Sequence, residues 1–246
     1  MKRLNWQIVL GAALVLSSAL VYLIHYFIFR DLHHIFIYLI GDIGFVFIEV
    51  LMVTLIIHRI LTVREKRSMI KKLNMVIGSF FSEVGTNLLK TLATFDVGSK
   101  DLTAELVVRP NWTDADFMKA HRCLKGYSFD IESRRGDLDG LKGFLAGKRN
   151  FMLRLLENPN LLEHDTFTDL LWAIFHLTEE LIHRKDVATL PVTDYNHISG
   201  DIKRAYMVLI SEWIDYMKHL KHDYPYLFSL AVRTNPFDPN ASVEVQ

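Results

Sequence analysis

The sequence predicts an all-α protein, made of an N-terminal two-helix transmembrane hairpin followed by a cytosolic helical bundle. Two long apolar segments, residues 6–29 and 35–57, come first and are joined by only five residues. Beyond them, apolar residues recur at steps of three and four, the period of a helix that buries one face. Helix caps and prolines then divide the rest of the sequence into several helices.

The hairpin occupies residues 1–62. Each apolar segment is long enough to cross a hydrocarbon core of about 30 Å, and a connection this short makes the two helices antiparallel neighbours. Lys2 and Arg3 precede the first segment and a cationic run follows the second, whereas Arg30 in the loop is offset by Asp31. The positive-inside rule therefore predicts a multi-pass protein of the inner (plasma) membrane with both termini cytoplasmic. A cleaved signal peptide fits less well, because the apolar run continues well past Ser17-Ser18-Ala19.

The bulk composition limits the classes of partner and compartment. Half of the residues are hydrophobic, which is high for a soluble protein and ordinary once two membrane spans are included. The 28 lysines and arginines balance 28 aspartates and glutamates, so a general nucleic-acid binder is not expected. The single cysteine, Cys123, excludes an internal disulfide and fits a reducing compartment. We interpret it as a buried structural thiol.

Residues 63–96 predict an amphipathic juxtamembrane helix. Its cationic start is expected to lie on anionic lipid headgroups, at about 1 kcal/mol for each cationic side chain near the surface. The basic residues are Arg64, Lys66, Arg67, Lys71 and Lys72. The predicted buried face consists of Ile70, Leu73, Ile77, Phe80, Val84, Leu88 and Leu92.

The first part of the cytosolic helical bundle, which spans residues 97–237, opens with an irregular stretch. Residues 102–109 are either a short strand or an extended connector. A helix then begins at Thr113, the predicted N-cap, with Asp116 closing a capping box and Trp112 packing on Phe117. Its buried side is expected to hold Phe117, Met118, His121 and Leu124.

The second part of the bundle contains a glycine stripe and two long helices. Gly136, Gly140, Gly143 and Gly147 would fall on one stripe of a helix. This stripe is a groove for a ligand or another backbone, a close helix crossing, or a glycine-weakened loop before the next helix starts. The following helix is capped by Asp165 or Thr166, and the last long helix begins near Pro191. Pro225 ends that helix, and residues 238–246 form a flexible tail. The two predicted core faces are Phe167, Leu170, Leu171, Ile174, Phe175 and Leu181, and Tyr195, Ile198, Ile202, Ala205, Leu209, Trp213, Tyr216 and Leu220.

Three ionisable residues lie within the predicted membrane spans. Asp42 and Glu49 are seven residues apart and so share a helix face, and the hairpin places His25 at a depth comparable to that of Asp42. Because charges in the hydrocarbon are costly, such residues are functional candidates by default. They form either a proton- or cation-responsive site, a polar seam between subunits, or neutral packing groups.

One cytosolic cluster has metal-ligand spacing. His176, Glu180 and His183 fall on one predicted helix, and Glu180-x-x-His183 is the step used by carboxylate-bridged di-metal bundles. Such sites need further ligands from facing helices, for which His164, His197 and Asp201 are possible partners. A solvated polar helix face explains the cluster equally well. No motif for a catalytic nucleophile or a phosphate-binding loop is present, so we predict no catalytic residue and no cofactor.

Three stretches resemble an uncharacterised group of prokaryotic integral membrane proteins. They are residues 72–85 (KLNMVIGSFFSEVG), 155–164 (LLENPNLLEH) and 224–237 (YPYLFSLAVRTNPF). The resemblance spans nearly the whole chain and implies a prokaryotic inner-membrane location, with no activity, cofactor or catalytic residue attached to it. The tail around Arg233-Thr234-Asn235 either docks a partner or folds back to close the end of the bundle.

These observations favour a membrane-anchored, non-enzymatic scaffold, regulatory or signal-relay protein that binds a protein partner or forms a homo-oligomer. The first alternative is an oligomeric channel or transporter subunit that uses Asp42 and Glu49. The second is a metal-dependent helical-bundle enzyme centred on His176, Glu180 and His183.

Overall fold

The computed structural model describes residues 6–159, 161 and 164–244. The chain divides into two compact units, Met1–Lys66 and Arg67–Gln246. Throughout the described residues the regular elements are helices, and the sole β feature is an isolated antiparallel bridge between Asp96 and Ile131. The all-α prediction is therefore confirmed.

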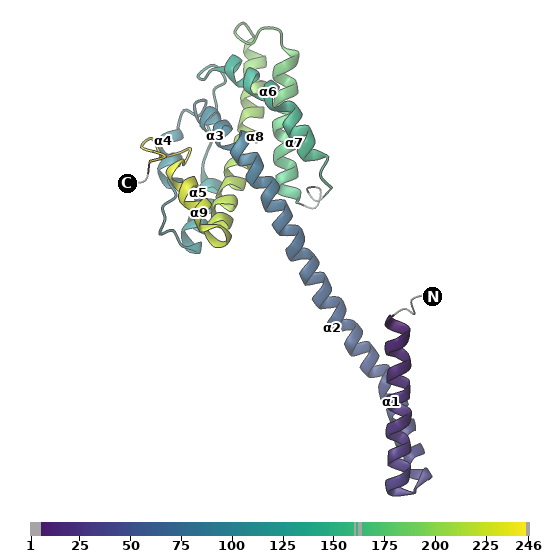
Figure 1. Ribbon diagram of the computed structural model, residues 1–246. Helices are drawn as coiled ribbons and strands as arrows, with labels where there is room; N and C mark the ends of the chain where they lie inside the picture. Colours follow the sequence, from purple (N-terminus) through teal and green to yellow (C-terminus); the bar gives the residue numbers. More distant parts are fainter. Residues whose placement is uncertain (1–5, 160, 162–163, 245–246) are drawn as a thin grey trace. The chain divides into compact units, whose positions relative to one another are not determined.

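The first unit is a helical hairpin (Figure 1). Helix α1 spans Trp6–Phe29, and α2 spans Leu32–Phe80, so its first part belongs to this unit. Arg30 takes a positive φ of 50° in the turn, and the Asp31 carboxylate accepts hydrogen bonds from the amides of His33 and His34. Because Asp31 caps α2, this helix begins at Leu32, three residues before the apolar segment expected to start at residue 35.

The second unit is a bundle organised around its longest helix, α8 (Val192–Asp223), which packs against α3, α5, α7 and α9 (Figure 1). The remaining elements, in chain order, are the end of α2, the π-helix η1 (Phe81–Gly85), α3 (Thr86–Ala93), α4 (Ser99–Glu105), α5 (Asp114–Gly126), α6 (Leu138–Leu156), α7 (Asp165–His183) and α9 (Pro225–Arg233). α7 also packs against α6, so α7 and α8 together carry most of the interior contacts.

The predicted juxtamembrane face is confirmed wherever side chains are described. Leu73, Ile77, Phe80, Val84, Leu88 and Leu92 are all buried, and the side chain of Ile70 lies outside the described residues. The helix is not continuous, because the π-helix η1 interrupts it. At Gly85 a Cβ would stand only 2.5 Å from the Phe81 ring. The Phe80 ring also lies close, at 2.9 Å from that position. The absence of a side chain at Gly85 therefore leaves space for both rings in the core, where Phe81 stacks on Tyr216 and Phe80 packs on Phe167.

The start of α5 follows the prediction closely. The Thr113 amide donates to the Asp116 carboxylate at 2.6 Å, which closes the capping box. The rings of Trp112 and Phe117 pack edge to face with centroids 5.1 Å apart. Met118 was expected in the core and is 56% exposed, because the buried face of α5 runs through Phe117, Ala120 and Leu124 at steps of three and four. Cys123 is half-buried rather than enclosed.

The prediction for residues 102–109 was wrong for the first half, whereas residues 107–109 form a connector without regular secondary structure. Helix α4 covers Ser99–Glu105 and thus takes in the first half of that stretch. Leu102 and Leu106 are both completely buried, and their separation of four residues is the spacing of one helix face.

The glycine stripe is neither a ligand groove nor a close helix crossing. α6 starts at Leu138, so Gly136 precedes the helix. Apart from chain neighbours and the backbone of α6 itself, no described atom lies within 4 Å of a Cβ placed on Gly143 or Gly147. Gly140 lies beside the capping carboxylate of Asp137, which accepts a hydrogen bond from the Gly140 amide.

The core faces of α7 and α8 are confirmed, with Tyr195 and Tyr216 half-buried at the edge and the others buried. The cap of α7 differs from the prediction, because the His164 ring accepts from the Phe167 amide in place of a side chain at Asp165 or Thr166. After α9, Asn235 and Phe237 are buried, and Phe237 packs on Trp213. The tail up to Phe237 thus closes the end of the bundle.

Candidate metal site

Two histidines and one aspartate meet where α7 and α8 run side by side. α7 contributes His176, and α8 contributes His197 and Asp201 one helical turn apart. The two helices are antiparallel neighbours: Arg184 at the end of α7 pairs with Asp194 at the start of α8, and His176, about two helical turns before Arg184, lies beside Asp201. The packing of these two helices, whose apolar faces fill the core, fixes the positions of the three side chains.

Asp201 is the centre of the group. Its Oδ2 atom lies 3.4 Å from Nε2 of His176 and 3.3 Å from Nε2 of His197. The three ligand-type atoms all lie within 4.8 Å of one another. The Asp201 side chain is 3% exposed, whereas those of the two histidines are about half exposed. The arrangement therefore has a buried carboxylate at its base and imidazoles at its rim.

The two oxygens of Asp201 differ in their partners. Oδ1 lies 3.2 Å from a guanidinium nitrogen of Arg204. Oδ2 is buried and accepts no hydrogen bond among the described residues, although both imidazoles are close. A buried acceptor without a hydrogen bond costs about 1–3 kcal/mol or more when it is charged, so this oxygen calls for a cationic partner.

Glu180 adds a second carboxylate at the edge of the group. Its oxygens lie 3.5 Å from Nε2 of His197 and 4.0 Å from Nε2 of His176. A hydrogen bond from Arg184 at 2.6 Å, together with the positive charge of that residue, lowers the pKa of Glu180. Hydrogen bonds to Asp194 and Glu180 raise the pKa of Arg184 in return. Glu180 is therefore an anion at neutral pH, and one of its oxygens is occupied by Arg184.

His183, the third residue of the predicted cluster, does not join this group. Its ring nitrogen lies 2.8 Å from the Glu179 carbonyl oxygen, and its side chain is 76% exposed. The last carbonyls of a helix lack partners within the helix, and His183 binds one of them at the end of α7. The structure instead brings in His197 and Asp201, which the sequence offered only as possible partners. Their spacing of four residues on one helix was the available signal.

The ionisable residues of the hairpin make few contacts. The His25 ring is half-buried and stacks on His34 with centroids 6.0 Å apart. Asp42 and Glu49 are exposed on α2. In the basic stretch, Arg64 and Lys72 are exposed, and the side chains of Lys66, Arg67 and Lys71 lie outside the described residues.

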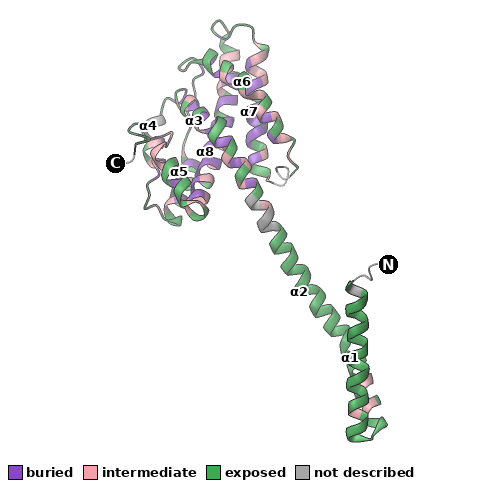
Figure 2. Cartoon of the chain, viewed as in Figure 1, coloured by how far each residue is buried: buried purple, intermediate pink, exposed green. Residues whose placement is uncertain are grey.

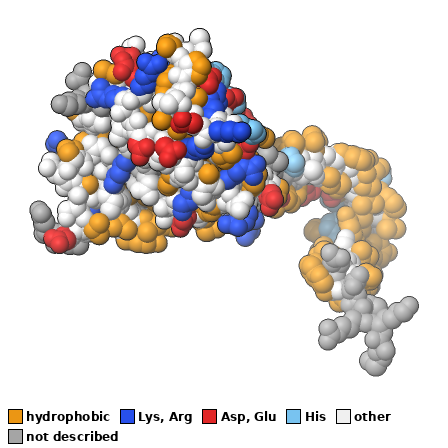
Figure 3. All heavy atoms as spheres, turned by 90° about the horizontal axis from the view of Figure 1, so that it is seen from above, with side chains coloured by type: hydrophobic (Ala, Val, Ile, Leu, Met, Phe, Trp, Pro, Cys, Tyr) orange, Lys and Arg blue, Asp and Glu red, His pale blue; other side chains and the backbone are white. Residues whose placement is uncertain are grey.

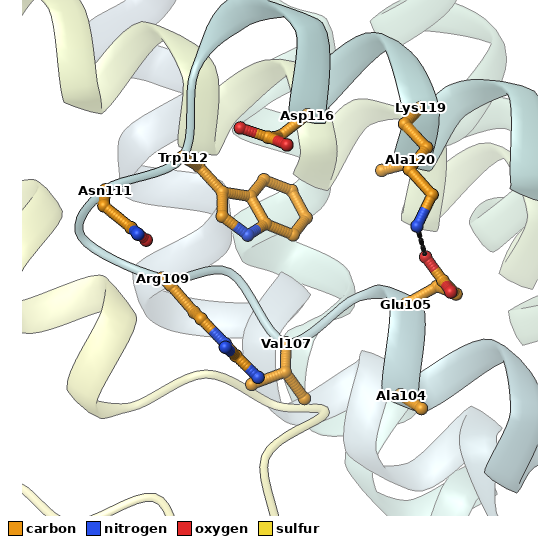
Figure 4. A pocket seen from close by; sticks show the side chains of 9 residues that line it. All are labelled: Ala104, Glu105, Val107, Arg109, Asn111, Trp112, Asp116, Lys119 and Ala120. Atoms are coloured by element: carbon orange, nitrogen blue, oxygen red, sulfur yellow. Dashed lines mark hydrogen bonds and ion pairs between the residues drawn. The ribbon is translucent and has the colours of Figure 1, made fainter.

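A polar hollow of about 310 Å³ lies between α4 and α5 (Figure 4). Trp112 and Arg109 line it, and the dashed contact in the figure is the 2.7 Å ion pair between Lys119 and Glu105. Its acidic side chain Asp116 is engaged in the capping box. Asp116 thus stabilises the start of α5, and Lys119 joins α5 to α4 through Glu105.

Comparison with known proteins places both units in one family. A family model described as the N-terminal helical domain of MJ1433 matches residues 2–61, and one described as the C-terminal helical domain of the uncharacterized protein MJ1433 matches residues 69–233. The chain belongs to the MJ1433 family. The uncharacterized protein MJ1433 of the archaeon Methanocaldococcus jannaschii is 43% identical over 242 residues, which cover 98% of this chain and 97% of that protein. No solved structure matches.

Membership of the MJ1433 family confirms the resemblance to a prokaryotic group without an assigned activity. Both family models describe helical domains, in agreement with the fold. The family descriptions name no activity.

Proposed function

We propose that this MJ1433-family protein is a non-enzymatic membrane protein whose hairpin lies in the cytoplasmic membrane and whose helical domain binds a protein partner in the cytosol. In this proposal the protein serves in scaffolding, regulation or signal relay.

The observation that carries the proposal is the exposure of the hairpin. Its two apolar helical stretches, Ile8–Phe29 and Leu32–Glu65, have mean hydropathies of 2.2 and 2.3, and their most apolar windows contain no buried residue. In Figure 3, hydrophobic side chains make up most of the visible described face of this unit. Moving one Val, Leu, Ile or Phe side chain out of water stabilises by about 1.5–3 kcal/mol, and lipid is the environment that provides this for helices apolar on all sides.

The orientation is proposed from charge. Lys2 and Arg3 before the first helix, and the run from Arg59 to Lys72 after the second, outweigh the single Arg30 of the loop. Cationic segments stay on the cytoplasmic side. A fluorescent reporter fused after Gln246 should be active in the cytoplasm, and a periplasm- or exterior-dependent enzyme reporter inserted after Asp31 should be active outside. The opposite pair of results would contradict the proposal.

A partner-binding surface is supported by α9. Tyr226, Leu227 and Leu230 on this short helix are 70%, 41% and 42% exposed, while Phe228 is buried. Aromatic and apolar side chains that stay exposed beside a well-filled core are typical of interaction surfaces. A photo-crosslinking residue at Tyr226 should capture a protein in intact cells, whereas one at the exposed Lys90 of α3 should not. Equal labelling at both positions would argue against a specific surface.

An oligomeric channel is the second candidate, and the exposed carboxylates of α2 favour it. Asp42 and Glu49 lie on the same side of the otherwise apolar first part of α2 and are exposed in the single chain. Carboxylates inside a bilayer usually face a bundle interior or a water-filled cavity. If the chain assembles around them, Glu49→Gln changes ion or proton flux in reconstituted vesicles. Flux equal to that of empty vesicles for the unaltered protein would remove this candidate.

A further inference from the structure

We propose that His176, His197 and Asp201 bind one divalent metal ion of the zinc type, with the fourth coordination position left to water. The site lies between α7 and α8, within the bundle, and it goes beyond the partner-binding role proposed above. The ligand atoms are Nε2 of both histidines and Oδ2 of Asp201.

The donor set suits this class of metal. Neutral imidazole nitrogens and a carboxylate oxygen are the ligands of many zinc sites, and three protein ligands with one open position are typical of sites that keep a bound water. Magnesium and calcium prefer sites made mainly of oxygens. A set with two nitrogens out of three donors therefore favours a transition metal.

The spacing of the donors fits tetrahedral coordination. Ligand atoms placed about 2.0–2.1 Å from a tetrahedral centre are separated by about 3.3 Å. The two separations from Asp201 Oδ2 are 3.4 Å to His176 and 3.3 Å to His197. Two of the three edges therefore match a tetrahedral site, and the third, between the two imidazole nitrogens, is no longer than 4.8 Å.

The buried carboxylate oxygen supplies an independent reason for a cation. Asp201 is 97% buried, since its side chain is 3% exposed, and Oδ2 accepts no hydrogen bond from the described residues. Arg204, whose side chain is 61% exposed, lies at the other oxygen, Oδ1. That contact fixes the carboxylate in orientation and directs Oδ2 toward the two imidazoles, in the way that partners outside the coordination shell orient metal ligands.

The surroundings of the fourth position are partly exposed to solvent and carry negative charge. Both histidines lie at the solvent-facing rim, and the Glu180 carboxylate stands 3.5 Å from His197 and 4.0 Å from His176. Glu180 is held by Arg184, so it does not move in to become a ligand. It is placed instead to accept a hydrogen bond from a metal-bound water and to add negative charge beside the ion.

The first test is a cobalt titration of the full-length protein in mild detergent after removal of metals by a chelator. Co²⁺ replaces zinc readily, and its visible absorption is strong in a tetrahedral site and weak in an octahedral one. We expect strong absorption that saturates at one Co²⁺ per chain and that Zn²⁺ abolishes by displacement. Mg²⁺ should not displace it. Absence of saturable binding, or a weak octahedral spectrum, would overturn the proposal.

Variants assign the site to these residues. His197→Gln and His176→Gln should each weaken Co²⁺ binding by about 100-fold or more, since loss of an outer-shell partner alone costs about 10- to 100-fold. His183→Gln is the matched control, because His183 lies on the same helix as His176 and was part of the predicted cluster. The His183→Gln protein should bind Co²⁺ as tightly as the unaltered protein does. Equal loss in His183→Gln, or unchanged binding in His197→Gln, would show that the ion is held elsewhere.

A thermal measurement separates ligand loss from misfolding. Both histidine side chains are about half exposed, so their replacement should leave the melting temperature of the metal-free protein within about 2 °C. Saturating Zn²⁺ should raise the melting temperature of the unaltered protein by several degrees, because an ion that binds the folded state stabilises it. No rise should occur for His197→Gln. A zinc-induced rise of the same size in that variant would contradict the site.

Discussion

The apolar residues are exposed in one unit of this chain and buried in the other. In the hairpin, Phe47 on α2 is 75% exposed and Leu16 on α1 is 71% exposed, and the described large hydrophobic side chains around them are exposed as well. In the helical domain, Phe80 on the same helix α2 is completely buried. Figure 2 shows this change along α2, from exposed residues in the first unit to buried ones in the second.

This difference in burial follows from how the apolar residues are distributed around the helices of each unit. In the domain, apolar residues occupy one face of each helix, so packing helices together removes that face from water. In the hairpin, apolar residues surround each helix, and one neighbouring helix cannot cover them. The domain is thus stabilised by its own core, whereas the apolar side chains of the hairpin stay exposed in the single chain; the proposed function places them in lipid.

The largest effect should come from one substitution made in both units. Phe80→Ala removes a ring that packs edge to face on Phe81 and Phe167, with centroids 5.3 and 5.2 Å away. A buried phenylalanine replaced by alanine costs about 3–5 kcal/mol. Phe47→Ala on the same helix should leave the free energy of unfolding of the domain nearly unchanged. Denaturant unfolding of both variants in detergent measures this difference. Equal losses of unfolding free energy in the two variants would contradict the contrast between the two units.

A smaller loss is expected at the closed end of the bundle. The buried Asn235 side chain donates to the Leu106 carbonyl at 3.1 Å and accepts from the Phe237 amide at 2.9 Å. Asn235→Ala leaves both backbone groups without these partners and should lower the free energy of unfolding by about 2–3 kcal/mol. The exposed Asn240 is the control, and Asn240→Ala should cost nothing measurable. If Asn235→Ala were as mild as the control, this closure would not stabilise the domain.

Loss of the capping box at the start of α5 should lower the free energy of unfolding by about 1 kcal/mol. Thr113→Ala removes a hydroxyl that lies 2.7 Å from the Asp116 carboxylate, and loss of an N-cap costs about 0.5–2 kcal/mol. Thr91→Ala removes a hydroxyl bound to a carbonyl within α3 and should cost less, because no helix end is left uncapped. The midpoints of thermal unfolding give the order, and a larger loss for Thr91→Ala would contradict it.

The smallest effect concerns pH. Burial lowers the pKa of His219 below its usual value of 6.5, with Asp223 opposing the shift. Above pH 6.5 the ring is neutral in both states; below it, the unfolded chain binds a proton that the folded domain does not, so stability falls as pH decreases. His219→Asn should therefore lose less stability between pH 7.5 and 5.5 than the unaltered protein. The control is His222→Asn, since the His222 side chain is 85% exposed. This substitution should leave the pH dependence of stability unchanged.

Much of the domain could be predicted because its signals are local. The spacing of Leu73, Ile77 and Phe80 defines a helix face from the sequence alone, and Thr113 with Asp116 is a recognisable capping pair. His164 was missed as the cap of α7, since histidine is not among the usual N-cap residues. The segment from Leu102 was misread because two buried leucines in a short helix give too little periodicity to separate helix from strand.

The candidate site could be predicted only in part, for a physical reason. His176 and Glu180 share one helix, so their spacing revealed them. His197 and Asp201 lie on the next helix, and which of its turns faces His176 depends on how α7 and α8 slide against each other. That register is set by the shapes of buried side chains along both helices, which no local pattern records. The same lack of register information explains why His183 was wrongly included in the predicted cluster. It has the expected spacing from Glu180, but it lies at the end of α7 and binds the Glu179 carbonyl.

The most direct test of the contrast between the two units is alkaline carbonate extraction of membranes from cells that express the full-length chain. Carbonate at high pH removes proteins held by charge or by other proteins and leaves those embedded in lipid. The account predicts that the chain stays in the membrane pellet, while a chain beginning at Arg67, without the hairpin, is found in the soluble fraction. Release of the full-length chain into the supernatant would contradict a hairpin that depends on lipid.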